Sequence, residues 1–351
     1  MKSTPIVIPC ASIHPGQINL YSEIQWNPHK PSRKSSDESA RIFEPKYEHL
    51  LKSKRTAEGN VSEIAKRKML RGLKYLLLMA NEKTVHNVYT GRMFKFKIAF
   101  VTLTLPSAQI HSDNEIKSKC LNQLLIELKK QYHVKNYIWR AEKQKNGNIH
   151  FHILVDKFIP HQELRDRWNR VTNKLGYVDR YRSEMLNFHK NGFKIRKDLL
   201  KTWPAEKQKA AFKRGARTHW NSPNSTDIHS VQRIQNVKQY ISKYLTKNEI
   251  EIKLEQKPES NISVQEGRIW SCNKELSNIK GAQTVIDSEL EIELEDLLET
   301  DGTRIIQDRY YSVIFFDMQI ILENPNSQLS KLFFNYMIDK FHYNMQGELP
   351  I

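Results

Sequence analysis

Residues 148–156 read NIHFHILVD, an apolar run that carries two histidines two positions apart. Short apolar runs with flanking polar residues are typical of buried strands. Side chains alternate between the two faces of a strand, so His150 and His152 point the same way while Phe151 turns toward the core. The pattern therefore predicts two imidazoles on one sheet face, an arrangement suited to holding a metal ion.

Two further strands are expected next to the histidine strand. Residues 94–105, FKFKIAFVTLTL, alternate in polarity and end before Pro106, which is typical of a strand. Residues 136–142, NYIWRAE, form the other, and the dipeptide Asn146-Gly147 that follows them favours a hairpin turn. This hairpin brings Glu142 back beside the histidine strand.

Helices are expected over residues 61–80, 114–131, 161–174 and 327–345, and a further strand over 226–233. Residues 1 to about 40 are rich in Ser, Pro and Lys and predict a mostly irregular arm. The region between residue 174 and the strand at 226–233 is basic and is also expected to be irregular. Alternating strands beside separate helices place the chain in the α+β class.

A second chemistry-bearing segment is VKQYISKYLTK, residues 237–247. Tyr240 and Tyr244 are four positions apart in a helical pattern of apolar residues, so both phenols lie on one helix face and can reach a common target. Lys243 and Lys247 each follow a tyrosine by three positions. The sequence has another tyrosine pair at the same spacing, at positions 177 and 181, but no lysine is interleaved there, and we interpret that pair as structural.

The charge of the chain is divided unevenly. The first 250 residues hold 47 Lys and Arg against 21 Asp and Glu, whereas residues 251–351 hold 9 against 18. A strongly basic body favours a polyanionic partner, with nucleic acid first and an anionic membrane second. No stretch approaches the 18 apolar residues of a membrane span, and the N-terminus lacks the order of a signal peptide, so we expect no membrane insertion and no secretion. The three cysteines show no metal-binding or disulfide spacing.

Residues 190–220 interleave many lysines and arginines with four aromatic residues. Cations that follow phosphates and rings that stack on unpaired bases suit a single-stranded nucleic acid. The alternative is an amphipathic helix whose aromatic residues lie in a core. The sequence alone leaves both readings open.

Three segments in order resemble motifs of the HUH endonucleases: FVTLTLP at 100–106, IHFHILV at 149–155 and YISKYLTK at 240–247. Within that superfamily they look most like the two-tyrosine rolling-circle replication initiator (Rep) proteins of small circular single-stranded DNA phages and bacterial plasmids. GRIWSCNKEL at 267–276 resembles a segment that often follows the tyrosine helix. The resemblance runs from about residue 95 to 280. It implies an HUH core, in which a central antiparallel sheet carries the His-x-His site and is flanked by helices that include the tyrosine helix.

The resemblance also implies roles for the residues singled out above. His150 and His152 would be metal ligands, and an acidic residue on the neighbouring strand completes the site in relatives, a position that Glu142 fits. The metal would be Mg²⁺ or Mn²⁺. Tyr240 and Tyr244 would be the nucleophiles of a DNA endonuclease and strand transferase, assisted by Lys243 and Lys247.

The implied activity is site-specific, metal-dependent nicking of single-stranded DNA at an origin of replication, through a 5′-phosphotyrosine intermediate, followed by strand transfer or religation. No phosphate loop of the form G-x-x-x-x-G-K-[ST] occurs in the sequence, so we expect no nucleotide cofactor and a separate host or plasmid helicase. The expected location is the cytoplasm, that of a bacterial host if a phage or plasmid encodes the chain.

Two other functions remain open from the sequence. A two-tyrosine transposase or a conjugative relaxase uses the same chemistry, although such proteins usually carry helicase or zinc modules that this sequence lacks. A non-catalytic nucleic-acid-binding protein with buried histidines is the other. For the domains, we expect an N-terminal arm and basic helix over residues 1–90, a nicking and strand-transfer domain over 91–280, and an acidic accessory region over 281–351.

Overall fold

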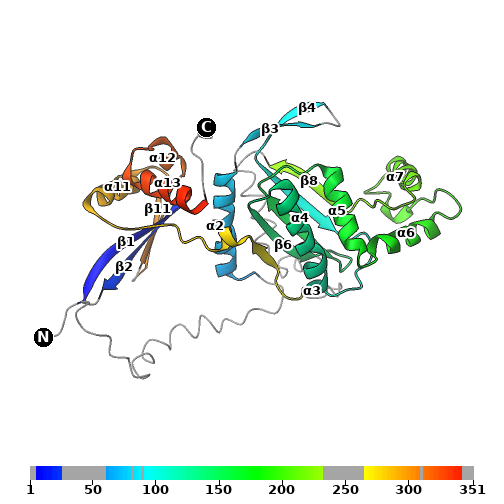
Figure 1. The fold of residues 1–351 in the computed structure, drawn as a ribbon, viewed down its shortest axis with the longest axis horizontal. Coiled ribbons are helices and arrows are strands. Elements are labelled where there is room, and N and C mark those ends of the chain that lie inside the picture. The colour runs from blue at the N-terminus through cyan, green and yellow to red at the C-terminus, as the bar shows by residue number, and fades with distance from the viewer. Residues whose placement is uncertain are drawn as a thin grey trace, which may run out of the picture. The chain divides into compact units, whose positions relative to one another are not determined.

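The computed structural model describes residues 5–25, 61–80, 82–87, 91–231, 265–308 and 311–341 (Figure 1). Contacts between residues divide the chain into two compact units. The central unit spans Thr56–Asn273, and the terminal unit combines the first 55 residues with Lys274–Ile351. This grouping differs from the three consecutive segments expected from the sequence, because the N-terminal strands pair with strands near the C-terminus.

An antiparallel sheet of five strands forms the centre of the central unit, in the order β8-β5-β7-β6-β9. The strand predictions made from polarity and from the Asn-Gly turn are confirmed here, except that the expected strand at 94–105 is divided at Lys97, with β4 before it and β5 after it. The strands of the sheet are β5 (Ile98–Thr104), β6 (Tyr137–Lys143), β7 (Ile149–Val155), β8 (Thr226–Val231) and β9 (Trp270–Cys272).

The register of these strands sets which side chains meet. Glu142 lies directly opposite His150 in the β6–β7 hairpin, and Thr102 of β5 lies opposite His152 on the other side. Facing residues in an antiparallel pair project to the same side of the sheet. The histidine face therefore collects side chains from three neighbouring strands.

The opposite face of the sheet carries the main core. Leu103 of β5 and Phe151 of β7 are fully buried there, together with Trp168. The helices that supply most of the remaining apolar side chains are α4 (Asn122–Tyr132) and α5 (His161–Asn173), and a π-helical turn, Lys117–Leu121, joins α4 to the short α3 (Asp113–Ile116). Because Phe151 is anchored in this core, the two histidines on either side of it must face away.

One end of the histidine face is covered by helix α2 (Glu63–Met79), as its apolar stripe predicted. Its residues Met69, Leu73 and Leu76 are buried, and an ideal Cβ on Gly72 would lie 3.4 Å from Cδ1 of Ile138 on β6. Ile138 shares its face with Glu142 because the two are four positions apart on one strand. The apolar end of this face is thus covered, and the polar residues lie toward its other end.

Between α5 and β8 the chain forms two further helices, α6 (Tyr177–Phe188) and α7 (Ala205–Arg217), with a 3-10 turn at Lys197–Leu199 between them (Figure 1). The prediction of an irregular basic region was wrong for these two helices. Their apolar residues are few and are spread among many cations, which masked the helical period. A separate two-stranded ribbon is formed by β3 (Lys83–Asn87) and β4 (Arg92–Phe96).

The terminal unit contains a second antiparallel sheet, ordered β10-β1-β2-β12-β11. The prediction of an irregular N-terminal arm was wrong for β1 (Ile6–His14) and β2 (Gln17–Gln25), a hairpin whose turn contains Gly16 at φ +63°. The hairpin is held from both sides by strands from the far end of the chain. The other elements of the unit are α10 (Lys274–Ser277), β10 (Ala282–Val285), α11 (Ser288–Glu299), β11 (Arg304–Gln307), β12 (Tyr311–Phe315), α12 (Gln319–Glu323) and α13 (Gln328–Phe341).

Across the part of the chain that the structure describes, no helix is both long and apolar enough to cross a membrane.

Candidate metal and nuclease site

Three predicted ligands come together on the histidine face of the central sheet. Glu142 of β6 and His150 and His152 of β7 each offer one ligand atom, and these three atoms lie within 4.8 Å of one another. The spacing follows from the sheet itself, since the two histidines alternate past Phe151 and the hairpin register sets Glu142 against them. Among the described residues, this is the only group of three or more His, Cys, Asp or Glu that meets this metal-site criterion.

His152 is oriented by contacts on three sides. Its Nε2 lies 2.8 Å from Oε1 of Glu142, and its Nδ1 lies 3.4 Å from Oγ1 of Thr102. The ring also stacks on Phe100, with 5.2 Å between ring centroids. Second contacts of this kind fix the orientation of a histidine before it binds a metal.

His150 has a different environment. It is only 9% exposed, and its Nδ1 has no hydrogen-bond partner among the described residues. Burial, reinforced by the neighbouring His152, lowers the pKa of His150 from 6.5 to about 4, although Glu142 acts in the opposite direction. A neutral, buried imidazole with an unused nitrogen is suited to ligating a cation.

Glu142 is held in its ionised form. Burial opposes ionisation, but the hydrogen bond from His152 and the nearby charges, including that of Arg140, together lower the pKa of Glu142. One carboxylate and two neutral imidazoles form a mixed oxygen and nitrogen set that fits Mn²⁺ and accepts Mg²⁺. The residues present therefore fit the divalent ion expected from the sequence.

Strand β8 adds polar residues that the sequence analysis did not single out. Asp227 lies opposite Thr102 and His229 opposite Phe100, so both share the histidine face. Their side chains are 71% and 42% exposed, and Nδ1 of His229 lies 3.6 Å from Oδ2 of Asp227. The signal was present in the alternation of TDIHSV, but the neighbouring strand of β8 could not be deduced from it.

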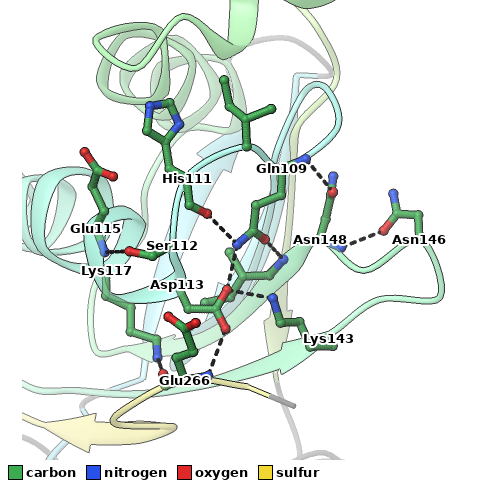
Figure 2. A network of polar contacts seen from close by, with 12 residues as sticks. Gln109, His111, Ser112, Asp113, Glu115, Lys117, Lys143, Asn146, Asn148 and Glu266 are labelled. Carbon is green, nitrogen blue, oxygen red and sulfur yellow. Dashed lines mark hydrogen bonds and ion pairs between the residues drawn. The ribbon is translucent and has the colours of Figure 1, made fainter. Parts of the chain in front are cut away.

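A buried polar network closes the end of the β6–β7 hairpin next to the site (Figure 2). At its centre, Oδ1 of Asp113 accepts hydrogen bonds from Nζ of Lys143 and from Nε2 of Gln109, both at 2.7 Å. Oδ2 of Asp113 accepts from the backbone N–H of Glu266 at 3.0 Å. Gln109 in turn accepts, at 2.6 Å, from the backbone N–H of Ile149, the residue before His150. The network therefore ties both hairpin strands to the residues that lead into β9.

Tyr177 has a structural environment. It is 1% exposed, and its hydroxyl accepts hydrogen bonds from the backbone N–H groups of Ile110 and His111 at 3.4 and 3.3 Å. Burial raises the pKa of Tyr177 and that of Tyr181. A buried phenol that is harder to ionise is a poor nucleophile, in keeping with the structural interpretation of this pair.

The predicted nucleophilic segment lies outside the described residues. Tyr240 and Tyr244, with Lys243 and Lys247, fall between the end of β8 at Val231 and Gln265. The structure thus brings together the three expected ligands and leaves the other four predicted site residues as predictions.

Residues 98–249 match a family model of replication-associated proteins, the ORF2 family. The matched stretch begins at β5, contains both strands of the metal hairpin and β8, and includes the sequence of the tyrosine segment. This is consistent with a replication initiator of the Rep type. No curated protein and no solved structure gives a significant match to the chain.

Proposed function

We propose that this protein initiates rolling-circle DNA replication as a metal-dependent, site-specific single-strand endonuclease and strand transferase of the HUH type. The observation that carries the proposal is the cluster of Glu142, His150 and His152 within a stretch that matches a replication-associated family. A buried imidazole with an unused nitrogen, next to an ionised carboxylate, is costly for folding unless it serves a ligand.

In this proposal, the three clustered residues hold one Mg²⁺ or Mn²⁺ ion. The bound ion would withdraw charge from a DNA phosphate and so make it easier to attack. His152 is already fixed by Glu142 and Thr102, and His150 needs no deprotonation near neutral pH. The protein's contribution is thus a neutral, preoriented ligand set at the open end of the sheet.

The chemical step is assigned to Tyr240 and Tyr244. A phenol oxygen forms a bond to the phosphorus while the bond from phosphorus to the 3′ oxygen breaks, and the phenol proton leaves as the 3′ oxygen gains one. The products are a 5′-phosphotyrosine and a free 3′-OH that can prime synthesis. Because the phosphodiester energy is conserved in the covalent link, religation needs no nucleotide cofactor.

Lys243 and Lys247 are assigned supporting roles in the same helix. A cation close to a phenol favours its ionised form and would lower its pKa from the usual value near 10. The same ammonium groups could contact the phosphate directly. With two tyrosines one turn apart, the second could cut the regenerated origin while the first still holds DNA.

The partners that follow are single-stranded DNA at an origin and a separate helicase that unwinds it, acting in the cytoplasm of a bacterial host if a phage or plasmid encodes the protein. A two-tyrosine transposase or a relaxase would use the same site. The match to a replication-associated family favours the initiator over those two functions.

The test is formation of a covalent adduct. The protein, Mn²⁺ and labelled single strands from its own replicon are incubated, denatured and separated by size. We expect DNA to remain attached to the wild type and to be lost when Tyr240 and Tyr244 are both replaced by Phe. An adduct that persists in this double variant, or no adduct with any strand of the replicon, would overturn the proposal.

A further inference from the structure

The helical insert, residues 177–220, is a distinct basic element of the central unit. It comprises α6, the turn Lys197–Leu199 and α7, and it joins α5 to β8. It holds 12 Lys and Arg against 4 Asp and Glu. Within this described segment, a single ion pair is present, between Arg196 and Asp198 at 2.7 Å. Most of the positive charge is therefore not neutralised by the insert's own acidic residues.

Helix α7 presents this charge as an ordered stripe. Lys209, Lys213 and Arg217 follow one another at four-residue intervals and are all exposed. Residues at this spacing lie on one helix face, about 6 Å apart along the axis. Lys207 and Arg214 are exposed next to them, and Glu206 is the helix's acidic residue. A rigid row of cations at this interval is complementary to a row of phosphates.

The aromatic residues of the insert are used mainly to hold it together. The ring of His189 lies 4.8 Å from Phe212 and 5.7 Å from Trp220, centroid to centroid. Phe212 is also 5.6 Å from Phe193. Trp220 is 8% exposed and packs so closely on α7 that an ideal Cβ on Gly215 would lie 2.4 Å from its Nε1. The alternative of an amphipathic helix with aromatic residues in a core is the one that the structure favours.

The insert ends close to the metal-bearing end of the sheet. Six residues after Trp220, the chain starts β8, so the two points are at most roughly 20 Å apart. In between, the carbonyl of Ser225 accepts hydrogen bonds from the N–H and the hydroxyl of Thr104, at 2.8 and 2.9 Å. Thr104 lies opposite His150 in the sheet. DNA bound by the insert would thus lie within reach of the candidate nuclease site.

We propose that the stripe on α7 binds the phosphate backbone of duplex DNA that flanks the site of cleavage. A non-specific single-strand surface gains much of its affinity from bases stacked on exposed rings, and the rings here are largely engaged with one another. Duplex DNA offers a stiff, dense row of phosphates that cations alone can bind. The binding needs neither the metal nor the tyrosines, so it stands or falls separately from the proposed nicking reaction.

The experiment uses the full chain in EDTA and compares two variants with equal charge change. The test variant is K209E/K213E/R217E, and the matched control is K129E/K130E/K135E, which alters exposed lysines at the end of α4 and just after it. Fluorescence anisotropy measures binding to a labelled random duplex of about 25 base pairs and to one of its single strands. Circular dichroism checks that each variant is folded.

We expect the test variant to bind the duplex at least tenfold more weakly than the control at low salt. Each lost phosphate contact lowers the slope of log K against log salt by about 0.9, so the duplex slope should become shallower by roughly 2.7. Single-strand affinity should fall much less. A duplex affinity equal to that of the control, or an equal loss on both probes, would contradict the proposal.

A neutral variant, K209Q/K213Q/R217Q, guards against misfolding or repulsion caused by the added glutamates. It removes the three cations without adding negative charge. The same selective loss of duplex binding is expected, with a smaller magnitude. Wild-type duplex affinity in this variant would also overturn the assignment.

Discussion

His150 shows how a binding site can reduce the stability of the fold that carries it. Its imidazole is buried and its Nδ1 has no partner among the described residues, so the folded chain disfavours the protonated form. The pKa is lowered to about 4 in the folded chain and is about 6.5 when the chain unfolds. Between these values the unfolded chain binds more protons, so the stability from this residue is present above pH 6.5 and is lost as the pH falls toward 4.

The pH dependence can be tested in metal-free protein. In EDTA, lowering the pH from 7 to 5 should cost the wild type about 2 kcal/mol of unfolding free energy through His150 alone. Denaturant titrations at the two pH values should show a smaller loss for His150→Gln. His229→Gln is the control, since that side chain is 42% exposed. An identical pH dependence in wild type and His150→Gln would show that His150 is not held neutral by burial.

Tyr177 illustrates the opposite case, a functional-looking residue with a structural role. Replacing it with Phe removes the hydroxyl that accepts hydrogen bonds from Ile110 and His111. Leaving buried donors unpaired should lower the free energy of unfolding by roughly 1–3 kcal/mol. Adduct formation below the unfolding temperature should persist in Tyr177→Phe and in Tyr181→Phe. Peptide mapping that places the DNA on either tyrosine would reverse the assignment of the nucleophiles.

Among the elements, the β6–β7 hairpin depends on the buried pair of Asp113 and Lys143. Their side chains are 2% and 6% exposed, and the charged atoms are 2.7 Å apart. Burial raises the pKa of Asp113, but hydrogen bonds from Lys143, Gln109 and Glu266 outweigh it, so the pKa is lowered overall. A pair that is paired so completely costs little when intact and much when one partner is removed.

Lys143→Met should therefore destabilise the chain by about 3–5 kcal/mol, because it leaves Asp113 buried and unpaired. Adding Asp113→Asn should recover part of that loss. The control is Lys119→Met, which breaks an exposed pair with Glu115 and should cost less than about 1 kcal/mol. Denaturant unfolding of the four proteins measures this coupling, and strictly additive effects would show that the two side chains do not act as a pair.

Elements with strong local signals were predictable from the sequence. The alternation of residues 149–155 and the Asn-Gly turn placed β6 and β7, and with them Glu142 beside the histidines. Strand β8 was predicted, but not its position next to β5, so Asp227 was missed. Sheet pairing between distant segments depends on packing that no local pattern records, which is why the hairpin of β1 and β2 was read as irregular.

At the scale of the whole molecule, the charge follows the two units. Residues 56–273 carry 41 Lys and Arg against 20 Asp and Glu, and the rest of the chain carries 15 against 19. The acidic helix α11 belongs to the terminal unit, whose sheet also needs β1 and β2. Ending the chain near residue 283 would break that sheet, so removal of the whole terminal unit is the cleaner change.

A fragment of residues 56–273 should fold alone, because the central sheet and its core lie within it. If the acidic unit competes with DNA for the basic surface, the fragment should bind random DNA more tightly than the full chain at low salt. The gain should fade as salt screens the charges. A folded fragment with unchanged non-specific affinity would instead indicate that the terminal unit binds a partner.

The central claim is that Glu142, His150 and His152 bind the divalent ion used for cleavage. The most direct measurement is calorimetric titration of Mn²⁺ into the wild type and into His150→Ala/His152→Ala, at pH 7. The wild type should bind one ion in this site, and the double variant should lose that binding while remaining folded, because both side chains face away from the core. Unchanged Mn²⁺ binding in the folded double variant would contradict the account.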